Sequence, residues 1–178
     1  MTDKSYALDA WYATEKLLNI DSPTGFCAYA AAWVKNAFES LGFDTKMTQK
    51  GGVIIDLGGT NSENALLLEA HTDTLGAMVA EVKSNGRLRL SPLGGMSPNN
   101  GECENLRVYT REGKIIEGTL QLCNASMHVN GDYSTAARTW DTVEAVLDED
   151  VSSADATKKL GIEAGDIVCF DPRAKLTA

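Results

Sequence analysis

The stretch LLLEAHTDTLGAMV, residues 66–79, marks the point where one type of fold gives way to another. Its leucines are apolar on both faces, which is typical of a strand covered on both sides. The run ends at His71, and Asp73 follows two residues later. Residues i and i+2 of a strand project to the same side, so we expect the Asp73 carboxylate to reach the His71 ring and orient it. Taken alone, the pattern also allows a capping or core histidine followed by an aspartate that opens a turn.

The residues before this stretch predict an α/β arrangement. Helical periodicity is loose over residues 5–20 and clear over residues 30–41, where Gly42 stands at the position of a C-terminal left-handed residue. Strands are predicted within GFDTKMTQ (42–49), VIIDLGG (53–59) and ALLLEAH (65–71), the last buried in the centre of a sheet. In open α/β sheets, ligands bind beyond the carboxyl ends of strands. His71 and Asp73 stand at such an end, although three strands and two helices make only part of a parallel α/β domain.

The residues after Gly76 predict a β-rich module. A hairpin is expected over residues 76–95 around Asn85-Gly86, and a second over residues 106–122 with its turn near Glu112-Gly113. A further strand is expected within residues 139–149, a short helix at SSADATKKLG (152–161), and a last strand in AGDIVCFDP (164–172). The expected organisation is an N-terminal α/β part at 1–73, a β-rich domain at 74–165 and a return strand at 166–178.

Composition excludes several classes of function. The chain has 178 residues, a formal net charge of −9 and a pI of about 4.7. Nucleic acid and anionic membrane surfaces are therefore not expected as partners, because both require clustered Lys and Arg. Four scattered cysteines without a C-x-x-C pair indicate reduced, mostly buried thiols. Cys27 at a possible helix start is a minor candidate for a nucleophile, since no base is positioned beside it.

The metal chemistry of His71 is incomplete in this sequence. A catalytic zinc site needs three protein ligands, and the only other histidine is His128 in NASMHVNG. No G-x-S-x-G elbow, Walker A loop or G-x-G-x-x-G fingerprint is present. His128 is interpreted as a polar loop residue.

Several passages, in order, resemble the metallo-aminopeptidases of peptidase family forty-two, the glutamyl aminopeptidase or tetrahedral-aminopeptidase group. LLNIDSPTGF looks like the family's opening helix and S-P-x-G turn, and AHTDTLGAMVAEVKSNGRLRLSPLGG looks like its A-H-x-D strand, hairpin and Gly-Gly turn. GKIIEGTLQLCNASMH and LGIEAGDIVCFDP look like its later strands. The resemblance covers essentially the whole chain.

The resemblance implies the N-terminal half of a zinc-peptidase-like α/β domain, with an inserted β-rich dimerisation domain of PDZ-like or β-barrel character. It implies a cytoplasmic aminopeptidase that removes N-terminal residues from peptides with two divalent ions, zinc or cobalt. His71 would be a metal ligand, Asp73 the catalytic residue that orients it, and the β-rich domain would build homo-oligomers. The family's L-D-D motif and later ligands have no counterpart here, so we expect an N-terminal fragment, inactive by itself, and whether it binds any ion stays open.

Two other interpretations remain open. The chain could serve as a non-catalytic assembly module, in which the β-rich part mediates association. Thr74 stands where many members carry Glu, and the resulting H-T-D-T also resembles carboxypeptidase-like enzymes. The G-D-x-V-x-F-D pattern of the last strand favours the aminopeptidase group over these enzymes.

Overall fold

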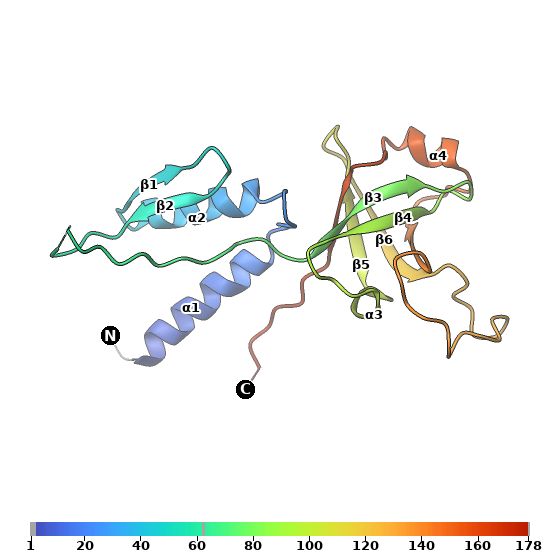
Figure 1. Cartoon of the computed structure of the whole chain (residues 1–178), viewed down its shortest axis with the longest axis horizontal. Helices are drawn as coiled ribbons and strands as arrows, with labels where there is room; N and C mark the ends of the chain where they lie inside the picture. The colour runs from blue at the N-terminus through green and yellow to red at the C-terminus, as the bar shows by residue number, and fades with distance from the viewer. Residues whose placement is uncertain (1–2, 62, 178) are drawn as a thin grey trace. The chain divides into compact units, whose positions relative to one another are not determined.

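The computed structural model describes residues 3–61 and 63–177, which form two compact units (Figure 1). The first unit contains Met1–Thr74 together with Pro172–Ala178, and the second is Leu75–Asp171. The first is therefore assembled from two separate parts of the sequence, with the second lying between them in the chain.

Two helices dominate the first unit. They are α1 (Asp3–Leu18) and α2 (Ala28–Ser40), as the helical periodicity predicts. Helix α2 buries Ala30 and Ala31, and it ends where Gly42 adopts a φ of +89°, a conformation that glycine takes without steric cost. Beyond this glycine the chain folds back, and the ring of Phe43 packs edge-on against that of Phe38.

The sheet of the first unit has two strands. Strands β1 (Asp44–Met47) and β2 (Val53–Asp56) form where strands are predicted, but they pair antiparallel as a hairpin. The prediction of a third, buried strand at residues 65–71 is wrong: this segment is irregular, and Leu66, Leu67 and Leu68 are 84%, 81% and 73% exposed. A strand exists only where another chain segment satisfies its backbone hydrogen bonds, and the described residues of this unit provide no such neighbour for the leucine run.

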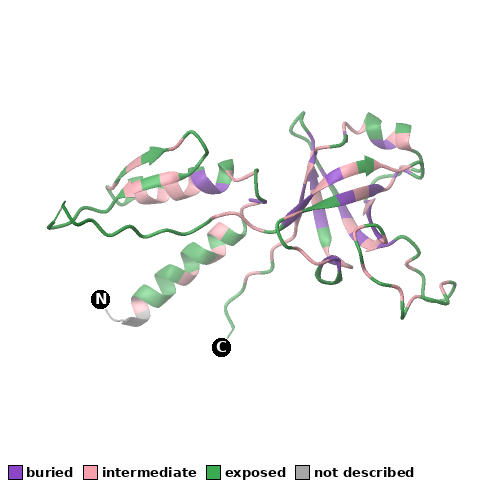
Figure 2. Cartoon of the chain, viewed as in Figure 1, coloured by how far each residue is buried: buried purple, intermediate pink, exposed green. Residues whose placement is uncertain are grey.

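The second unit is a closed barrel of six antiparallel strands in the order β3-β4-β7-β6-β5-β8. The strands are β3 (Gly76–Val82), β4 (Leu88–Leu93), β5 (Asn105–Tyr109), β6 (Ile115–Leu122), β7 (Val143–Leu147) and β8 (Ile167–Phe170). Buried side chains alternate with less buried ones clearly along β5 and β6, so that one face of each of these strands points inward. The buried residues accordingly concentrate in the barrel, as the colouring of Figure 2 shows.

Turn and capping residues place the barrel elements as the sequence predicts. Gly86 and Gly113 have φ values of +85° and +81° at the tips of the two predicted hairpins. Helix α4 (Ala154–Lys159) begins at Ser153, whose hydroxyl accepts a hydrogen bond from the Ala156 amide. A further short helix, α3 (Pro98–Gly101), precedes β5.

Strand β8 belongs to the barrel by its pairing. Val168 pairs with Ala77 of β3 on one side and with Val108 of β5 on the other. The sequence interpretation assigned residues 166–178 to a return strand of the α/β part. In the structure, residues 167–170 close the barrel, because they pair with β3 and β5 and place Val168 in the core with Phe170 packed against it. Only the residues from Pro172 onward group with the first unit.

Candidate functional site

The predicted site lies where a tight turn meets the segment after the leucine run. Pro23 and Thr74 form an isolated parallel bridge, and the Thr74 amide donates to the Ser22 carbonyl at 2.7 Å. The Phe26 amide donates to the Pro23 carbonyl at 2.7 Å, and Gly25 has the positive φ that a type II turn requires at this position. These contacts hold residues 22–26 beside residues 71–74.

The side chains of His71, Asp73 and Thr24 form a hydrogen-bonded row. His71 Nδ1 lies 2.9 Å from Asp73 Oδ1 and 3.1 Å from the Asp73 carbonyl oxygen. The Thr24 hydroxyl donates to the other carboxylate oxygen, Asp73 Oδ2, at 2.6 Å. The His71–Asp73 contact is the one that the H-x-D spacing predicts. Sequence reasoning gave no role to Thr24, which lies 49 positions before Asp73, although it stands in the quoted S-P-T-G turn.

The electrostatics of this row determine which ring nitrogen is free. The hydrogen bond from Thr24 is the largest influence on Asp73 and holds the pKa of its carboxyl below the usual value, with partial burial acting in the opposite direction and His71 adding to the decrease. An ionised carboxylate only accepts hydrogen bonds, so a neutral His71 carries its proton on Nδ1. Its lone pair is then on Nε2, for which the described residues provide no partner. The His71 side chain is 84% exposed.

These residues fit a metal ion only in part. An imidazole whose Nδ1 donates to a carboxylate is the usual arrangement of a metal-ligating histidine. However, residues 3–61 and 63–177 contain no group of three or more His, Cys, Asp or Glu side chains placed to hold an ion. The described chain thus supplies one oriented imidazole and no complete site, so no catalytic step through a metal follows from it.

The other residues considered from the sequence lie apart from this row. His128 is exposed in a turn that follows β6, in agreement with its interpretation as a loop residue. None of the four cysteines forms a disulfide. Only Cys169 is buried, so the expectation of mostly buried thiols is wrong for the exposed Cys103 and Cys123, which fall in turns rather than strands. The Cys27 thiol lies 3.5 Å from the Pro23 carbonyl oxygen and has no base positioned beside it among the described residues.

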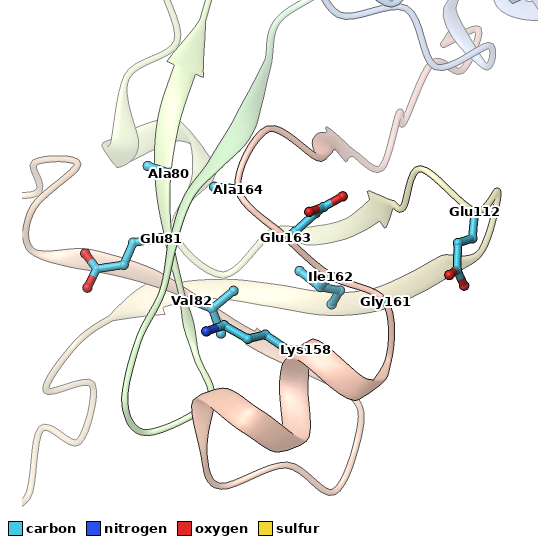
Figure 3. A pocket seen from close by; sticks show the side chains of 9 residues that line it. All are labelled: Ala80, Glu81, Val82, Glu112, Lys158, Gly161, Ile162, Glu163 and Ala164. Atoms are coloured by element: carbon cyan, nitrogen blue, oxygen red, sulfur yellow. The ribbon is translucent and has the colours of Figure 1, made fainter.

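An open cavity of about 650 Å³ lies on the barrel, between β3 and the segment that follows α4 (Figure 3). Three carboxylates line it, but each is neutralised by its own cation: Glu81 pairs with Arg89, Glu112 with Lys114, and Glu163 with Arg111. None of the residues predicted for the site lines this cavity.

The buried carboxylate of the barrel has a structural role. Glu144 is 1% exposed and accepts hydrogen bonds from Lys83 and Arg87. Burial alone would raise the pKa of Glu144, but these two donors outweigh it and hold the pKa below its ordinary value. The cluster joins β7 to the hairpin between β3 and β4.

Comparison with known proteins places these features in a family context. The sequence profile of the M42 glutamyl aminopeptidase family matches residues 51–178. One relative is the protein named "Putative aminopeptidase YhfE" of Bacillus subtilis (strain 168). It is 37% identical to this chain over 164 residues, which are 92% of this chain and 47% of that protein.

Solved structures share the fold. An aminopeptidase from the archaeon Desulfurococcus kamchatkensis superposes with a TM-score of 0.77 at 23% identity, over 93% of this chain and 44% of that one. The TET1 peptidase of Pyrococcus horikoshii, which can assemble into a tetrahedron or a large octahedral shell, superposes with a TM-score of 0.72 at 21% identity, over 89% of this chain and 46% of that one. The chain spans about half the length of the curated relatives it matches. None of the described helices is long and apolar enough to cross a membrane.

Proposed function

Since the chain belongs to the M42 glutamyl aminopeptidase family, we propose that it contributes part of a metal-dependent aminopeptidase that removes N-terminal residues from peptides. His71 is the metal ligand in this proposal, and Asp73 is the catalytic residue that orients it. Bound zinc or cobalt ions would supply the Lewis acidity that activates water for peptide hydrolysis. The enzyme would act in the cytoplasm.

One observation carries this proposal: the 2.9 Å contact between His71 Nδ1 and Asp73 Oδ1 leaves the Nε2 lone pair exposed. The alternative of a capping or core histidine has less support, because residues 65–71 form no strand that His71 could cap and its side chain is 84% exposed. The contact also lies in the A-H-x-D stretch, inside the part of the chain that matches the family.

The barrel has its own place in the proposal, as a domain inserted into the peptidase domain that mediates homo-oligomerisation. The first unit is formed from residues on both sides of the barrel in the sequence, which supports an insertion. The fold-level likeness to a peptidase that assembles into closed shells supports an oligomer.

A second candidate function is a non-catalytic assembly module. It is favoured by the contrast between the units: the barrel is closed and has a continuous apolar core, whereas the described residues of the first unit supply a single imidazole to any metal site. The two candidates make different predictions about metal.

Metal titration followed by NMR distinguishes them. In the chain as it stands, added Co²⁺ is expected to broaden and shift the ring signals of His71 at a lower metal concentration than those of His128. The physical reason is that Asp73 fixes the His71 tautomer, whereas the described structure gives His128 no such carboxylate. Asp73→Asn is expected to lower the His71 response about 10- to 100-fold, the usual effect of removing the partner of a ligating histidine.

His128→Ala is the matched control, since it removes the other imidazole and is expected to leave the His71 response unchanged. Equal responses from the two rings, or a His71 response that is the same in Asp73→Asn, would contradict the metal-ligand role and leave the assembly module as the function of these residues.

A further inference from the structure

Thr24 is the member of the hydrogen-bonded row that has no role so far. Its hydroxyl donates to Asp73 Oδ2 at 2.6 Å, while Asp73 Oδ1 is engaged by His71 Nδ1 at 2.9 Å. The carboxylate is thus held from both sides, with one oxygen directed to each partner. A carboxylate with only one partner can rotate about its terminal torsion, which is broad and roughly two-fold.

The backbone around Thr24 fixes the hydroxyl in place. The Pro23–Thr74 bridge and the Thr74 amide bond to Ser22 connect the turn directly to the residue after Asp73. Gly25, at +90°, lets the chain turn immediately after Thr24. The Thr24 hydroxyl is therefore presented to Asp73 by a braced turn, although the residue itself is exposed.

We propose that Thr24 is a positioning residue for His71: its hydroxyl holds the Asp73 carboxylate so that His71 carries its proton on Nδ1 and presents the Nε2 lone pair. The functional meaning of this inference rests on the proposed function, because a fixed Nε2 lone pair matters only if His71 binds a metal ion. Its physical content, the control of the tautomer, can be measured without any ligand.

The chain offers a matched control for this role. Thr45 donates its hydroxyl to Glu39 Oε1 at 2.7 Å in the same unit, so it forms the same type of threonine–carboxylate hydrogen bond with no histidine attached. Thr24→Val and Thr45→Val each remove one hydroxyl and keep the branched shape of the side chain. Thr24→Ser keeps the hydroxyl and serves as the rescue variant, and Thr24→Ala provides a second deletion.

The measurement is the tautomer of His71, read from the ¹⁵N chemical shifts of its ring nitrogens in metal-free protein at pH 8. The wild type is expected to show predominantly the Nδ1–H form. Thr24→Val, Thr24→Ala and Asp73→Asn are each expected to lose this preference and show both tautomers, while Thr24→Ser and Thr45→Val are expected to keep it.

Three results would overturn the inference: a wild type that already shows both tautomers, hydroxyl deletions at Thr24 that leave the Nδ1–H form intact, or a Thr45→Val variant that changes the tautomer equally. An equal change in Thr45→Val would mean that losing either hydroxyl destabilises the whole unit, with no specific effect of Thr24 on His71. Because no metal is present, a failure of His71 to respond to Co²⁺ counts against the proposed function alone. A Co²⁺ response that persists with an unchanged tautomer in Thr24→Val counts against the role of Thr24 alone.

Discussion

At the scale of single residues, the number of positions between two residues decides whether their contact could be predicted from the sequence. Asp73 lies two residues from His71, and this spacing predicted their contact, which the structure contains although the strand assumed in the prediction is absent. Thr24 lies 49 residues from Asp73, and nothing in a single sequence specifies that the two meet. The cations that hold Glu144 come from positions 83 and 87, more than fifty residues before it, and were missed for the same reason.

Glu144 gives the prediction at this scale. Its pKa in the folded barrel is below the usual value of 4.5, so its contribution to stability is fully present above pH 4.5 and is lost as the pH falls through the folded-state pKa. Glu144→Gln is expected to lower the free energy of unfolding at pH 7 by about 1.5–3 kcal/mol, the range for hydrogen bonds to charged groups, and to flatten the acid dependence. Urea unfolding from pH 7 to pH 3, followed by the methyl signals of the barrel core, measures both.

The control is Glu81→Gln. It removes the carboxylate from an exposed ion pair between Glu81 of β3 and Arg89 of β4. Its effect is expected to stay below about 1 kcal/mol, as for surface ion pairs in general. If the two variants lose the same stability, the buried cluster contributes no more than a surface pair.

At the scale of elements, the barrel was the more predictable part. Alternating strands separated by Asn85-Gly86 and Glu112-Gly113 turns are encoded locally, and both hairpins formed where predicted. The leucine run at residues 65–71 also has the composition of a strand, but a strand depends on a neighbour that its own residues cannot specify. Strands β1 and β2 pair with each other in a two-stranded sheet, and among the described residues neither of them pairs with the leucine run.

This exposed segment leads to a prediction of self-association. Removing a leucine side chain from water stabilises by about 1.5–3 kcal/mol, so three adjacent exposed leucines favour contact with a second copy. The chain is expected to form species that grow with concentration. Serine at Leu66, Leu67 and Leu68 together is expected to abolish the part of this growth that the leucines cause and to leave any oligomer formed through the barrel unchanged. Sedimentation velocity over a hundredfold range of concentration measures it.

The matched control carries serine at three exposed leucines that are separated in the sequence, Leu41, Leu57 and Leu176. It is expected to behave as the wild type, because isolated surface leucines are ordinary. A wild type that stays at one discrete size at every concentration would show that the leucine run does not cause self-association.

At the scale of the whole molecule, one unit has a complete fold and the other supplies only part of a functional site. The barrel closes on itself around one core, whereas the first unit shows a two-stranded sheet and one oriented imidazole. The ordered resemblance to the M42 family identified the family correctly because it extended over many separate passages rather than one motif.

The corresponding prediction concerns activity. The 178 residues by themselves are expected to hydrolyse aminoacyl p-nitroanilides no faster than free zinc or cobalt at the same concentration. One ligating imidazole with its orienting carboxylate cannot hold metal so that it both polarises a peptide carbonyl and activates water. The assay compares the wild type with His71→Ala in each metal. Turnover in the wild type that disappears in His71→Ala would contradict this expectation.

The pairing of β8 with β3 also bears on how the barrel is made during translation. Ala77 leaves the ribosome long before its partner Val168, and at 5–20 residues per second the interval is on the order of ten seconds. During this interval, the edge of β3 that pairs with β8 has no partner, and the apolar core of the barrel stays open to solvent. The hairpin of β3 and β4 can form early, but the barrel closes only after residue 170 has emerged, so a nascent chain stalled before that point would expose an open sheet to chaperones and proteases.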